Sequence, residues 1–445
     1  MVAGDQSDPA DVLIIGAGPG GYVAALRAAQ LGRAVTLVES RRVGGTCLNE
    51  GCIPSKHLAR FAAIKAEAQS FGASGMPPFS GLPDMAAFQR ARAGAVSTLV
   101  SGVESLLRAA RVDVVRGQAR FVGRTRVVVQ TGEEQVRFFD FKDVVIATGS
   151  EPIPWTEAPF DGERVVDASR ALEFDRVPES LLVIGDDYIA VESAVAWARL
   201  GSRVTLAAPE DRLLPELDVD ISAAALRGAK QTGIDVLLNT YPRDGGDHER
   251  VVVSMGRRAR FEDLDLAAAG IRKPSLAFEA DAQMRLDRHV FAIGDVTRGY
   301  GLAHTAMMQG RVAGDVLGGK NAAFDSRAVP IAVFAEPEMA TVGASDGAIG
   351  RFPLAALGRA LIEAKATSGF AKLVFDGEGG PLVGAHLAGP RSTELIAEMA
   401  LAIEMGATAE DLALTVHAHP TFAEALMEAA EVSLGRPIHV RKPKA

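Results

Sequence analysis

The chain is poor in the residues that mark secreted scaffolds and membrane spans. It contains only two cysteines among 445 residues, and aromatic residues make up 6%. Two cysteines are too few for a disulfide-rich secreted scaffold. No apolar run is long enough to span a bilayer, and the acidic, polar residues 1–10 do not resemble a signal peptide. We therefore expect a soluble cytoplasmic protein without a membrane span.

The charge balance argues against one further class of partner. The 47 Lys and Arg residues are outnumbered by 56 Asp and Glu residues, which gives a formal net charge of −9. A mildly acidic chain is not expected to have nucleic acid as its main partner. Its length provides material for roughly two to four domains, each with a core of its own.

An internal repeat organises the chain. Residues 13–16 read Leu-Ile-Ile-Gly and residues 182–185 read Leu-Val-Ile-Gly. The Leu-Gly pairs at 31–32 and 200–201 keep the same spacing, since 185 − 16 and 200 − 31 both equal 169. Each copy predicts a buried strand, a tight turn, an Ala-rich helix and a second strand. We therefore expect an α/β fold with two Rossmann-like, doubly wound domains and an α+β C-terminal domain.

The domain boundaries follow from one Pro-rich stretch and from later changes in pattern. Residues 151–159 make a plausible linker, and a second strand and loop at 290–295 follows the second repeat. From about residue 329 the pattern changes to strands and then two helices, near 392–405 and 421–434. We predict a first nucleotide-binding domain, a second one, a segment that completes the first and a C-terminal domain, over residues 1–152, 153–272, 273–326 and 327–445.

The first repeat carries a dinucleotide-binding motif. Gly16, Gly18 and Gly21 fit the pattern Gly-x-Gly-x-x-Gly between a strand and a helix. In that pattern the glycines permit a tight turn, close approach of a pyrophosphate and close helix–strand packing, and the helix N-terminus faces the phosphates. Glu39 ends the second strand, where a carboxylate can accept hydrogen bonds from ribose hydroxyls. The alternative is a Gly-rich turn in an unrelated α/β domain, but this context favours ligand binding.

Both cysteines lie in one short Gly-rich segment. A regular helix would separate Cys47 and Cys52 by about 7.5 Å along its axis, whereas a disulfide needs Cα atoms no more than roughly 6.8 Å apart. If they pair, the backbone must be distorted there, and Gly51 supplies the freedom. Two buried apolar thiols are the alternative. No further Cys or His has ligand spacing nearby, so we expect no metal site. Lys56 would favour a thiolate or an anionic cofactor, unless it is a solvated surface residue.

Residues 44–56 read Gly-Gly-Thr-Cys-Leu-Asn-Glu-Gly-Cys-Ile-Pro-Ser-Lys, which resembles the redox-disulfide segment of the pyridine nucleotide–disulfide oxidoreductases. The chain is most similar to the dihydrolipoamide dehydrogenase type. Further matches are the segments at 147–150, 292–296 and 302–304, and His417-Ala-His-Pro-Thr-x-x-Glu424 near the end. The resemblance covers nearly the whole chain.

The resemblance implies an FAD-containing homodimer. Cys52 would face the flavin, Cys47 would exchange with a dithiol substrate, and Lys56 and Glu192 would lie near the flavin. The partner subunit's His419 would complete each site. The positions that match the family's FAD-binding pattern are Gly16, Gly18, Pro19, Gly20, Gly21, Glu39, Gly45, Thr46, Lys56, Ala119, Thr148, Gly149, Asp295 and Ala303.

The residues His419 and Glu424 allow two interpretations. A dithiol must lose protons to react, and a His supported by a carboxylate suits that task. Alternatively, Thr421-x-x-Glu424 is a capping box at the start of a helix, and His419 is a loop residue. The residues alone leave the two nearly even, and the resemblance favours catalysis. We assign no role to His417.

The second repeat departs from the nucleotide-binding pattern. Gly16 maps to Gly185, but Gly18 maps to Asp187, Gly21 to Ala190 and Glu39 to Ala208. Asp187 adds bulk and charge where a pyrophosphate should lie, next to Asp186. Two like charges about 4 Å apart repel by roughly 4 kcal/mol at an effective dielectric of about 20. Only residues 239–250 remain where family members usually have a strand hairpin. We expect either an altered, weak NAD(H) site or none.

Three functions remain open. The leading one is an FAD-dependent oxidoreductase that oxidises a dihydrolipoyl group or another dithiol through Cys47 and Cys52, with a lipoyl-carrier protein as a possible partner. Electrons would then pass from the flavin either to NAD⁺, as in an ordinary dihydrolipoamide dehydrogenase, or to oxygen, a quinone or a protein. We favour the second version. The remaining alternative is a non-catalytic FAD-containing structural dimer.

Overall fold

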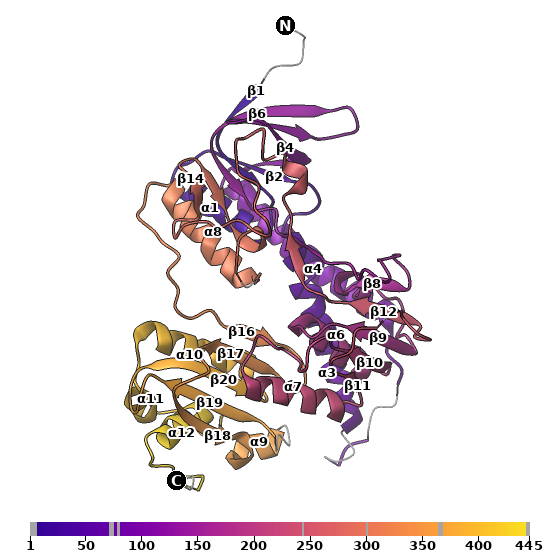
Figure 1. The fold of residues 1–445 in the computed structure, drawn as a ribbon, viewed down its shortest axis with the longest axis vertical. Helices are drawn as coiled ribbons and strands as arrows, with labels where there is room; N and C mark the ends of the chain where they lie inside the picture. Colours follow the sequence, from indigo (N-terminus) through magenta and orange to yellow (C-terminus); the bar gives the residue numbers. More distant parts are fainter. Residues whose placement is uncertain are drawn as a thin grey trace. The chain divides into compact units, whose positions relative to one another are not determined.

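A computed structural model describes residues 7–70, 75–77, 81–242, 244–299, 301–363 and 368–441 (Figure 1). The chain forms two compact units. The first consists of Met1–His57, Ala86–Ile153 and Gly256–Asp325, and the second of Leu58–Met85, Pro154–Met255 and Ser326–Ala445. Both units contain the α/β elements that the repeat predicts.

The first unit is built on a mostly parallel sheet with strand order β14-β15-β6-β1-β2-β3. Only β14 pairs antiparallel on this path, and the hairpin β4–β5 extends from β6. The strands are β1 (Ser7–Ile15), β2 (Val35–Glu39), β3 (Asp113–Arg116), β4 (Gln118–Gly123), β5 (Arg126–Gln130), β6 (Val136–Ile146), β14 (Arg285–Asp287) and β15 (Val290–Ala292). The central strands are buried on both faces of the sheet. Residues of α1 and α8 pack on one face, and residues of the β4–β5 hairpin pack on the other.

Two helices of the first unit touch through their backbones. A Cβ on Gly310 in α8 (Ala303–Leu317) would lie 2.3 Å from the carbonyl oxygen of Gly20 in α1 (Pro19–Gln30). Only glycine permits this approach, so Gly310 fixes how closely the two helices pack. The remaining elements that lie wholly or partly in this unit are α2 (Gly45–Asn49), α3 (Cys52–Gln69), α4 (Met85–Ala109), β7 (Ser150–Pro152), β13 (Arg257–Ala259), η2 (Glu262–Leu264) and η3 (Gly294–Val296).

The second unit repeats the same βαβ arrangement. Its parallel sheet has the order β11-β10-β9-β12-β8, and β9–α6–β10 corresponds to β1–α1–β2. The elements are β8 (Val165–Asp167), α5 (Ala168–Ala171), β9 (Ser180–Ile184), α6 (Tyr188–Leu200), β10 (Arg203–Ala207), α7 (Val219–Gln231), β11 (Asp235–Leu237) and β12 (Arg250–Val253). Between β11 and β12 the described residues 238–242 and 244–249 form no strand, in agreement with the missing hairpin.

The Pro-rich stretch after β7 contains the boundary between the two units, which falls between Ile153 and Pro154. Trp155 is only 1% exposed and packs with Val165, Leu182 and Val251 of the second sheet. The predicted linker at 151–159 therefore contains the boundary, and it also buries a large aromatic residue, which its proline content does not reveal.

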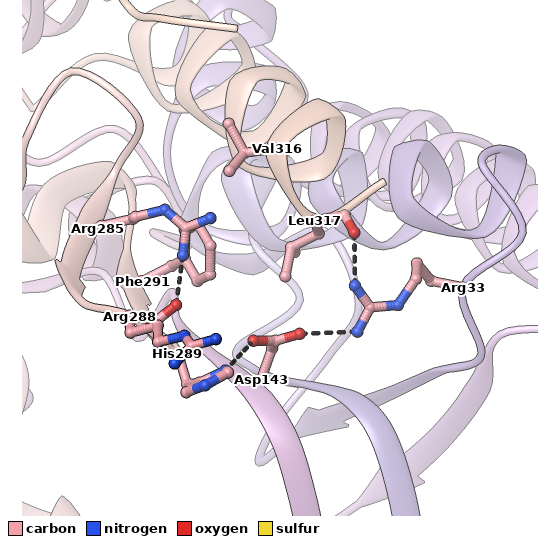
Figure 2. Close-up of a pocket in the computed structure, with 8 residues that line it drawn as sticks. All are labelled: Arg33, Asp143, Arg285, Arg288, His289, Phe291, Val316 and Leu317. Carbon is pink, nitrogen blue, oxygen red and sulfur yellow. Dashed lines mark hydrogen bonds and ion pairs between the residues drawn. The ribbon is translucent and has the colours of Figure 1, made fainter. Parts of the chain in front are cut away.

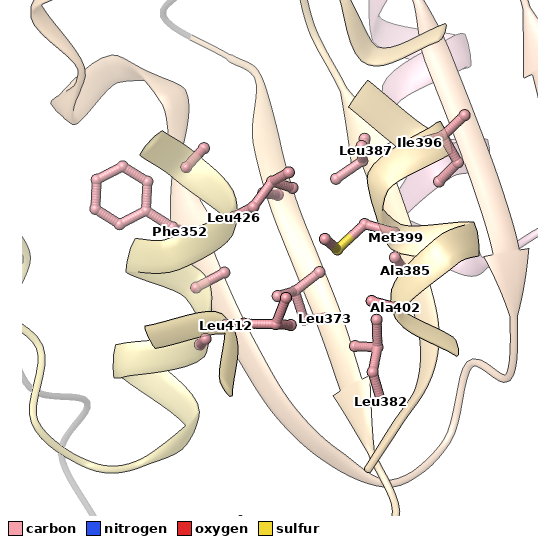
Figure 3. Packing of buried hydrophobic residues seen from close by; sticks show 14 of the residues in the cluster. Phe352, Leu373, Leu382, Ala385, Leu387, Ile396, Met399, Ala402, Leu412 and Leu426 are labelled. Carbon is pink, nitrogen blue, oxygen red and sulfur yellow. The ribbon is translucent and has the colours of Figure 1, made fainter. Parts of the chain in front are cut away.

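The C-terminal part of the second unit is an antiparallel sheet covered by helices, with strand order β16-β17-β20-β19-β18. Its elements are β16 (Ile331–Val333), β17 (Met339–Gly343), β18 (Ala348–Pro353), η4 (Leu354–Ala356), α9 (Gly358–Glu363), β19 (Phe370–Phe375), β20 (Leu382–Ala388), α10 (Ser392–Met405), α11 (Ala409–Leu414) and α12 (Glu424–Ser433). Figure 3 shows Met399 of α10 and Leu426 of α12 packing onto Leu373 and Leu387 of the sheet. The predicted helix at 392–405 is confirmed, and the second predicted helix begins at Glu424 rather than at 421.

A buried ionic cluster joins the start of α7 to the antiparallel sheet of the second unit. Asp218, the N-cap of α7, accepts a 2.8 Å hydrogen bond from Lys372 on β19, and their side chains are 0% and 6% exposed. His386 on β20 lies 3.7 Å from the same carboxylate.

Within the described residues, no helix is long and apolar enough to cross a membrane.

Candidate active site

The first glycine turn has the geometry that its motif predicts. Gly16 has φ of +105°, and a Cβ there would lie 2.3 Å from the carbonyl oxygen of Ala147. A Cβ on Gly21 would lie 1.8 Å from the carbonyl oxygen of Gly16. Both positions therefore exclude any side chain, since real Cβ atoms do not approach backbone oxygens so closely. The turn brings β1, β6 and α1 together.

The N-terminus of α1 is left uncapped by side chains. Its N-cap, Gly18, provides no side-chain hydrogen bond, and a Cβ there would meet only the Cα of Gly45 at 4.0 Å. Pro19 occupies the first turn and Gly20 is buried against α8. Backbone N–H groups at such a helix end lack intrahelical acceptors. This open cradle suits the phosphates of a dinucleotide.

Glu39 is held at the end of β2 by two backbone donors. Its Oε2 accepts a hydrogen bond from the N–H of Ala17 at 2.8 Å, and its Oε1 accepts one from Arg41 at 2.7 Å. The residue is 7% exposed. A carboxylate has further acceptor positions, so these bonds fix its orientation and leave capacity for ribose hydroxyls.

A second group of predicted residues follows β6 and β15. Asp295 accepts a 2.6 Å hydrogen bond from the hydroxyl of Ser150, which in turn accepts one from Arg257 at 2.8 Å. Thr148 donates its hydroxyl hydrogen to the carbonyl oxygen of Arg260. Gly149 has φ of +73°, and a Cβ there would meet no atom within 4 Å among the described residues. Sequence reasoning missed Arg257, because nothing near it in the sequence links it to Asp295.

The other predicted cofactor-binding residues lie on neighbouring elements. Gly45 and Thr46 begin α2, and a Cβ on Gly45 would lie 2.7 Å from the Cα of Gly18. Ala303 is the first residue of α8, whose N-cap also provides no side-chain hydrogen bond. Ala119 lies on β4 and is 5% exposed. A second uncapped helix N-terminus thus accompanies that of α1.

The two cysteines meet across the break between two helices. Cys47 lies in α2 and Cys52 begins α3, so the backbone is not one continuous helix and the distortion predicted around Gly51 is present. A hydrogen bond with Cys52, burial and the charge of Cys52 raise the pKa of Cys47, while the charge of Lys56 opposes this shift. The two sulfurs therefore form one interacting pair, influenced by the cation on α3.

His419 and Glu424 form a hydrogen-bonded pair at the start of α12. The Nδ1 of His419 lies 2.8 Å from Oε2 of Glu424, while Oε1 of Glu424 accepts the backbone N–H of Thr421 at 2.6 Å. The catalytic and the capping interpretations of this motif are therefore compatible, because one carboxylate oxygen of Glu424 contacts His419 and the other caps the backbone. The His419 side chain is 79% exposed, and among the described residues no hydrogen bond reaches its Nε2.

The pKa of Glu424 lies below its usual range. Burial opposes ionisation of this carboxyl, but hydrogen bonds from His419 and Thr421 and the charges of His419 and His417 outweigh it. An ionised Glu424 accepts a hydrogen bond from the Nδ1–H of His419, which leaves Nε2 as the basic nitrogen.

Glu192 lies on α6 and is buried. Its Oε1 accepts a 2.9 Å hydrogen bond from the backbone N–H of Phe334. This contact joins α6 to the strand region near β16 within the second unit.

The second glycine turn is closed by its own side chain. Asp187 is the N-cap of α6, and its Oδ1 accepts the backbone N–H of Ala190 at 2.8 Å. The hydroxyl of Ser254 donates to the same carboxylate, at 2.8 Å and 2.9 Å from its two oxygens. Asp187 therefore occupies the helix end that Gly18 leaves open in the first copy. Ala208, which replaces Glu39, is fully buried.

Burial dominates the electrostatics of Asp187. It raises the pKa of Asp187 to about 6, despite the hydrogen bonds from Ala190 and Ser254 that favour the ionised form. The charge of Asp186 contributes less to this shift than burial does. The like-charge repulsion that the sequence suggested is thus a smaller effect than desolvation.

A separate pocket of about 350 Å³ lies where the parallel strands of the first sheet begin, at the strand ends opposite to Glu39 and Asp295. Figure 2 shows Arg33 bound to Asp143, which also contacts His289. Arg33 precedes β2 and His289 precedes β15, whereas Glu39 and Asp295 stand at the other ends of these strands. The cations here complement the C-terminal end of α8, since Arg33 donates to the carbonyl oxygen of Leu317.

Comparisons with known proteins agree on one family. Residues 10–310 match the model "Pyridine nucleotide-disulphide oxidoreductase", and residues 329–430 match its dimerisation domain. The chain is 41% identical to a dihydrolipoyl dehydrogenase of Geobacillus stearothermophilus over 470 aligned positions, covering 99% of each chain. It is 38% identical to the dihydrolipoyl dehydrogenase of Bacillus subtilis, covering 99% of this chain and 100% of the relative.

Solved structures give the same result. LpdA from Mycobacterium tuberculosis matches with a TM-score of 0.86 and 25% identity, over 95% of this chain and 99% of that one. A Cu(II) complex of the HOCl-induced flavoprotein disulfide reductase RclA from Escherichia coli matches with a TM-score of 0.84 and 25% identity, over 96% and 99%. Because a family model covers more than half of the chain and its relatives align over nearly all of it, the chain belongs to the pyridine nucleotide-disulphide oxidoreductase family.

Proposed function

We propose that the chain is an FAD-dependent oxidoreductase that oxidises a dihydrolipoyl group or another small dithiol and passes the electrons to an acceptor other than NAD⁺. The observation that carries the second half is the capping of α6 by Asp187, at the position equivalent to Gly18. A pyrophosphate at this helix end would have to displace a carboxylate and leave Ser254 without its acceptor. The dithiol half rests on the Cys47–Cys52 pair and on His419.

The first unit fits FAD. The open N-terminus of α1 would receive the pyrophosphate, Glu39 the ribose, and Asp295 further polar groups of the dinucleotide. When bound, FAD supplies a two-electron carrier beside the cysteine pair. Lys56 would hold its positive charge near both the flavin and Cys47, where it favours anionic forms.

The protein residues would carry the thiol chemistry in two exchanges. Nε2 of the partner subunit's His419 takes a proton from the substrate, and the resulting thiolate attacks the sulfur of Cys47 in the disulfide form of the pair. The Cys47–Cys52 bond breaks and Cys52 leaves as a thiolate. The second substrate thiol then passes its proton to the Cys52 thiolate and attacks the first substrate sulfur, and Cys47 leaves and takes the proton held on Nε2 of the partner subunit's His419. The substrate is oxidised to a disulfide and the cysteine pair is reduced by two electrons.

Two other functions have observations in their favour. An ordinary NAD⁺-dependent enzyme is favoured by the dihydrolipoyl dehydrogenase relatives, and the parallel sheet of the second unit is retained. A non-catalytic structural dimer is favoured only by the closed turn at Asp187. The juxtaposed cysteines and the His419–Glu424 hydrogen bond count against it.

Anaerobic rapid mixing tests the proposal. We expect dihydrolipoamide to reduce the flavin of the wild-type protein and Cys52→Ser to abolish this reaction, with flavin content unchanged. The reduced enzyme is then mixed with NAD⁺, oxygen or a soluble quinone in separate experiments. Fast reoxidation by NAD⁺ at ordinary concentrations would overturn the NAD-independent proposal. Absence of flavin reduction with every dithiol tested would favour the structural dimer.

A further inference from the structure

The loop that carries His419 contains a second histidine, His417, with a different environment. The His417 side chain is 6% exposed, whereas that of His419 is 79% exposed. His417 follows α11 by only a few residues and stands two positions before His419. It is therefore an internal part of the loop and not a group that meets a substrate.

Both ring nitrogens of His417 face oxygens that can only accept hydrogen bonds. Nε2 lies 3.0 Å from a carboxylate oxygen of Glu398 on α10, and Nδ1 lies 2.9 Å from the carbonyl oxygen of Thr415 at the end of α11. A neutral imidazole has one N–H, and an imidazolium has two. Only the protonated ring satisfies both contacts with an ionised Glu398, so the geometry indicates a cation.

The surroundings of His417 agree with a cation. The groups that act on it are Glu398, through a hydrogen bond and its charge, the Thr415 carbonyl, and the charge of Glu424 on α12. Together they raise the pKa of His417 despite its burial. In return, the charge of His417 helps to lower the pKa of Glu424.

This arrangement links His417 to the reactive pair. The ring ties the backbone at 415–417 to α10, and two residues later the same backbone presents His419. Its charge also favours ionised Glu424, which accepts a hydrogen bond from the Nδ1–H of His419. Loss of the cation would therefore release the loop and weaken the group that sets the tautomer of His419.

We propose that His417, held as an imidazolium between Glu398 and Thr415, is a positioning residue for His419 and Glu424. The role in dithiol oxidation rests on the proposed function above. The protonation state of His417 does not, because it follows from contacts within one domain.

Ring-nitrogen NMR of ¹⁵N-histidine-labelled holoenzyme tests the cation directly. His417→Gln identifies the resonances of this residue. We expect both nitrogens of His417 to be protonated at pH 7, and Glu398→Gln to shift the ring towards the neutral form. A neutral His417 at pH 7 would overturn the proposal. This test does not depend on the proposed function, because it needs no reaction of the protein with a dithiol.

The dithiol half-reaction tests the positioning role. We expect His417→Gln to lower the limiting rate of dihydrolipoamide-driven flavin reduction by about tenfold at pH 7, while the dithiol concentration at half-saturation stays within about twofold. In the wild type, we expect the rate to decrease at alkaline pH as His417 loses its proton. In His417→Gln this decrease should be absent, because Gln does not titrate. The matched control is His439→Gln, which breaks another His–carboxylate pair, with Glu428 at 2.6 Å.

Two results would overturn the positioning role. One is a His417→Gln variant with the rate and pH profile of the wild type. The other is a His439→Gln control that changes both as much as His417→Gln does, because the effect would then be a general weakening of the domain.

Discussion

At the scale of single residues, the two copies of the βαβ unit differ most at the residue that precedes the helix. Gly18 leaves the N-terminus of α1 open, whereas Asp187 closes that of α6 with its own carboxylate. A helix N-terminus attracts an anion in either case. In the first copy the anion would be a ligand, and in the second it belongs to the chain.

Under the proposed function, reopening the second turn should make the flavin respond faster to NADH. In Asp187→Gly/Ala208→Glu, the N–H of Ala190 loses its side-chain acceptor and a carboxylate is placed where Glu39 stands in the first copy. We expect NADH to reduce the flavin of this variant at least about tenfold faster than that of the wild type. The variant lacks the carboxylate that would repel the pyrophosphate of NADH, and it gains a carboxylate that can accept hydrogen bonds from the ribose. Anaerobic loss of flavin absorbance measures this rate.

The control for this experiment is Ser254→Ala, which removes the hydroxyl donor but keeps the carboxylate of Asp187. It should behave as the wild type does towards NADH. If the double variant keeps its flavin and its dithiol reaction yet reacts with NADH no faster than the wild type, Asp187 and Ala208 do not limit the reaction with the nucleotide.

The charge of Asp187 should also appear in the pH dependence of stability. Its pKa is raised to about 6 in the folded protein, above the 3.9 or so of an unfolded Asp. The folded state then binds the proton more tightly, so stability rises as the pH falls from above 6 towards 4. Asp187→Asn removes this contribution, which is at most about 3 kcal/mol. Thermal midpoints of the holoenzymes at several pH values measure it.

The expected difference has a definite sign. Asn is also a good N-cap, so Asp187→Asn should exceed the wild type in stability most clearly above pH 7, and the gap should narrow below pH 6. Parallel pH profiles for the two proteins would show that Asp187 is not the titrating group.

At the scale of elements, the Lys372–Asp218 pair fixes α7 on the antiparallel sheet. Burial opposes ionisation of Asp218, yet the hydrogen bond from Lys372 and the charge of His386 keep the pKa of this carboxyl below its usual value. A Cβ on Gly228, farther along α7, would lie 1.8 Å from the carbonyl oxygen of Glu336. The helix is therefore held at its start by charge and near its end by backbone contact.

Breaking this pair should be costly. Lys372→Met leaves the fully buried carboxylate of Asp218 without its cation, and removing one partner of a buried pair typically costs about 3–5 kcal/mol. Lys372→Met/Asp218→Asn should recover a large part of this loss, because no uncompensated charge remains. The free energy of unfolding in urea, monitored on the holoenzymes, gives the comparison.

The pair Lys320–Asp315 supplies the control, because its charged atoms lie 3.7 Å apart, Lys320 is 50% exposed and Asp315 keeps a second cation in Arg27. Lys320→Met should change stability by less than about 1 kcal/mol. A Lys372→Met variant no less stable than Lys320→Met would contradict the proposed role of the buried pair.

The elements that the sequence predicted well are those whose chemistry is local. The glycine turn at Gly16 and the repeated βαβ units depend on residues close together in the chain, so their spacing is visible in the sequence. The contacts that it did not predict join distant residues. Ser254 lies 67 positions from Asp187, and Lys372 lies 154 positions from Asp218. Such pairings depend on tertiary packing, which residue spacing alone does not encode.

At the scale of the whole molecule, the match to a dimerisation domain supports a homodimer. Apolar side chains are exposed on α10 and beside the loop of His419, namely Leu401, Met405, Leu414 and Val416, at 62%, 76%, 71% and 94%. Large apolar side chains exposed to this extent are characteristic of an interaction surface. The loop with His417 and His419 is thus flanked by the residues that a second copy would cover.

Mixing two inactive variants should restore activity if each site is shared between subunits. Cys52→Ser and His419→Ala homodimers each lack one essential group. A hybrid dimer combines the cysteine pair of one subunit with the partner subunit's His419, so one of its two sites is complete. With random exchange, half of the dimers are hybrids, and about a quarter of the wild-type dithiol rate should return. No recovery after verified subunit exchange would place both groups in one chain.

The carboxylate that closes α6 has one more consequence under the proposed function. Dihydrolipoyl dehydrogenases that reduce NAD⁺ share their product with the rest of metabolism, so a high ratio of NADH to NAD⁺ drives such a reaction backwards. A flavoprotein that neither binds nor reduces the nucleotide is insulated from this ratio. With Asp187 in the place of a cofactor phosphate, dithiol oxidation would continue in a cell whose nicotinamide pool is already reduced.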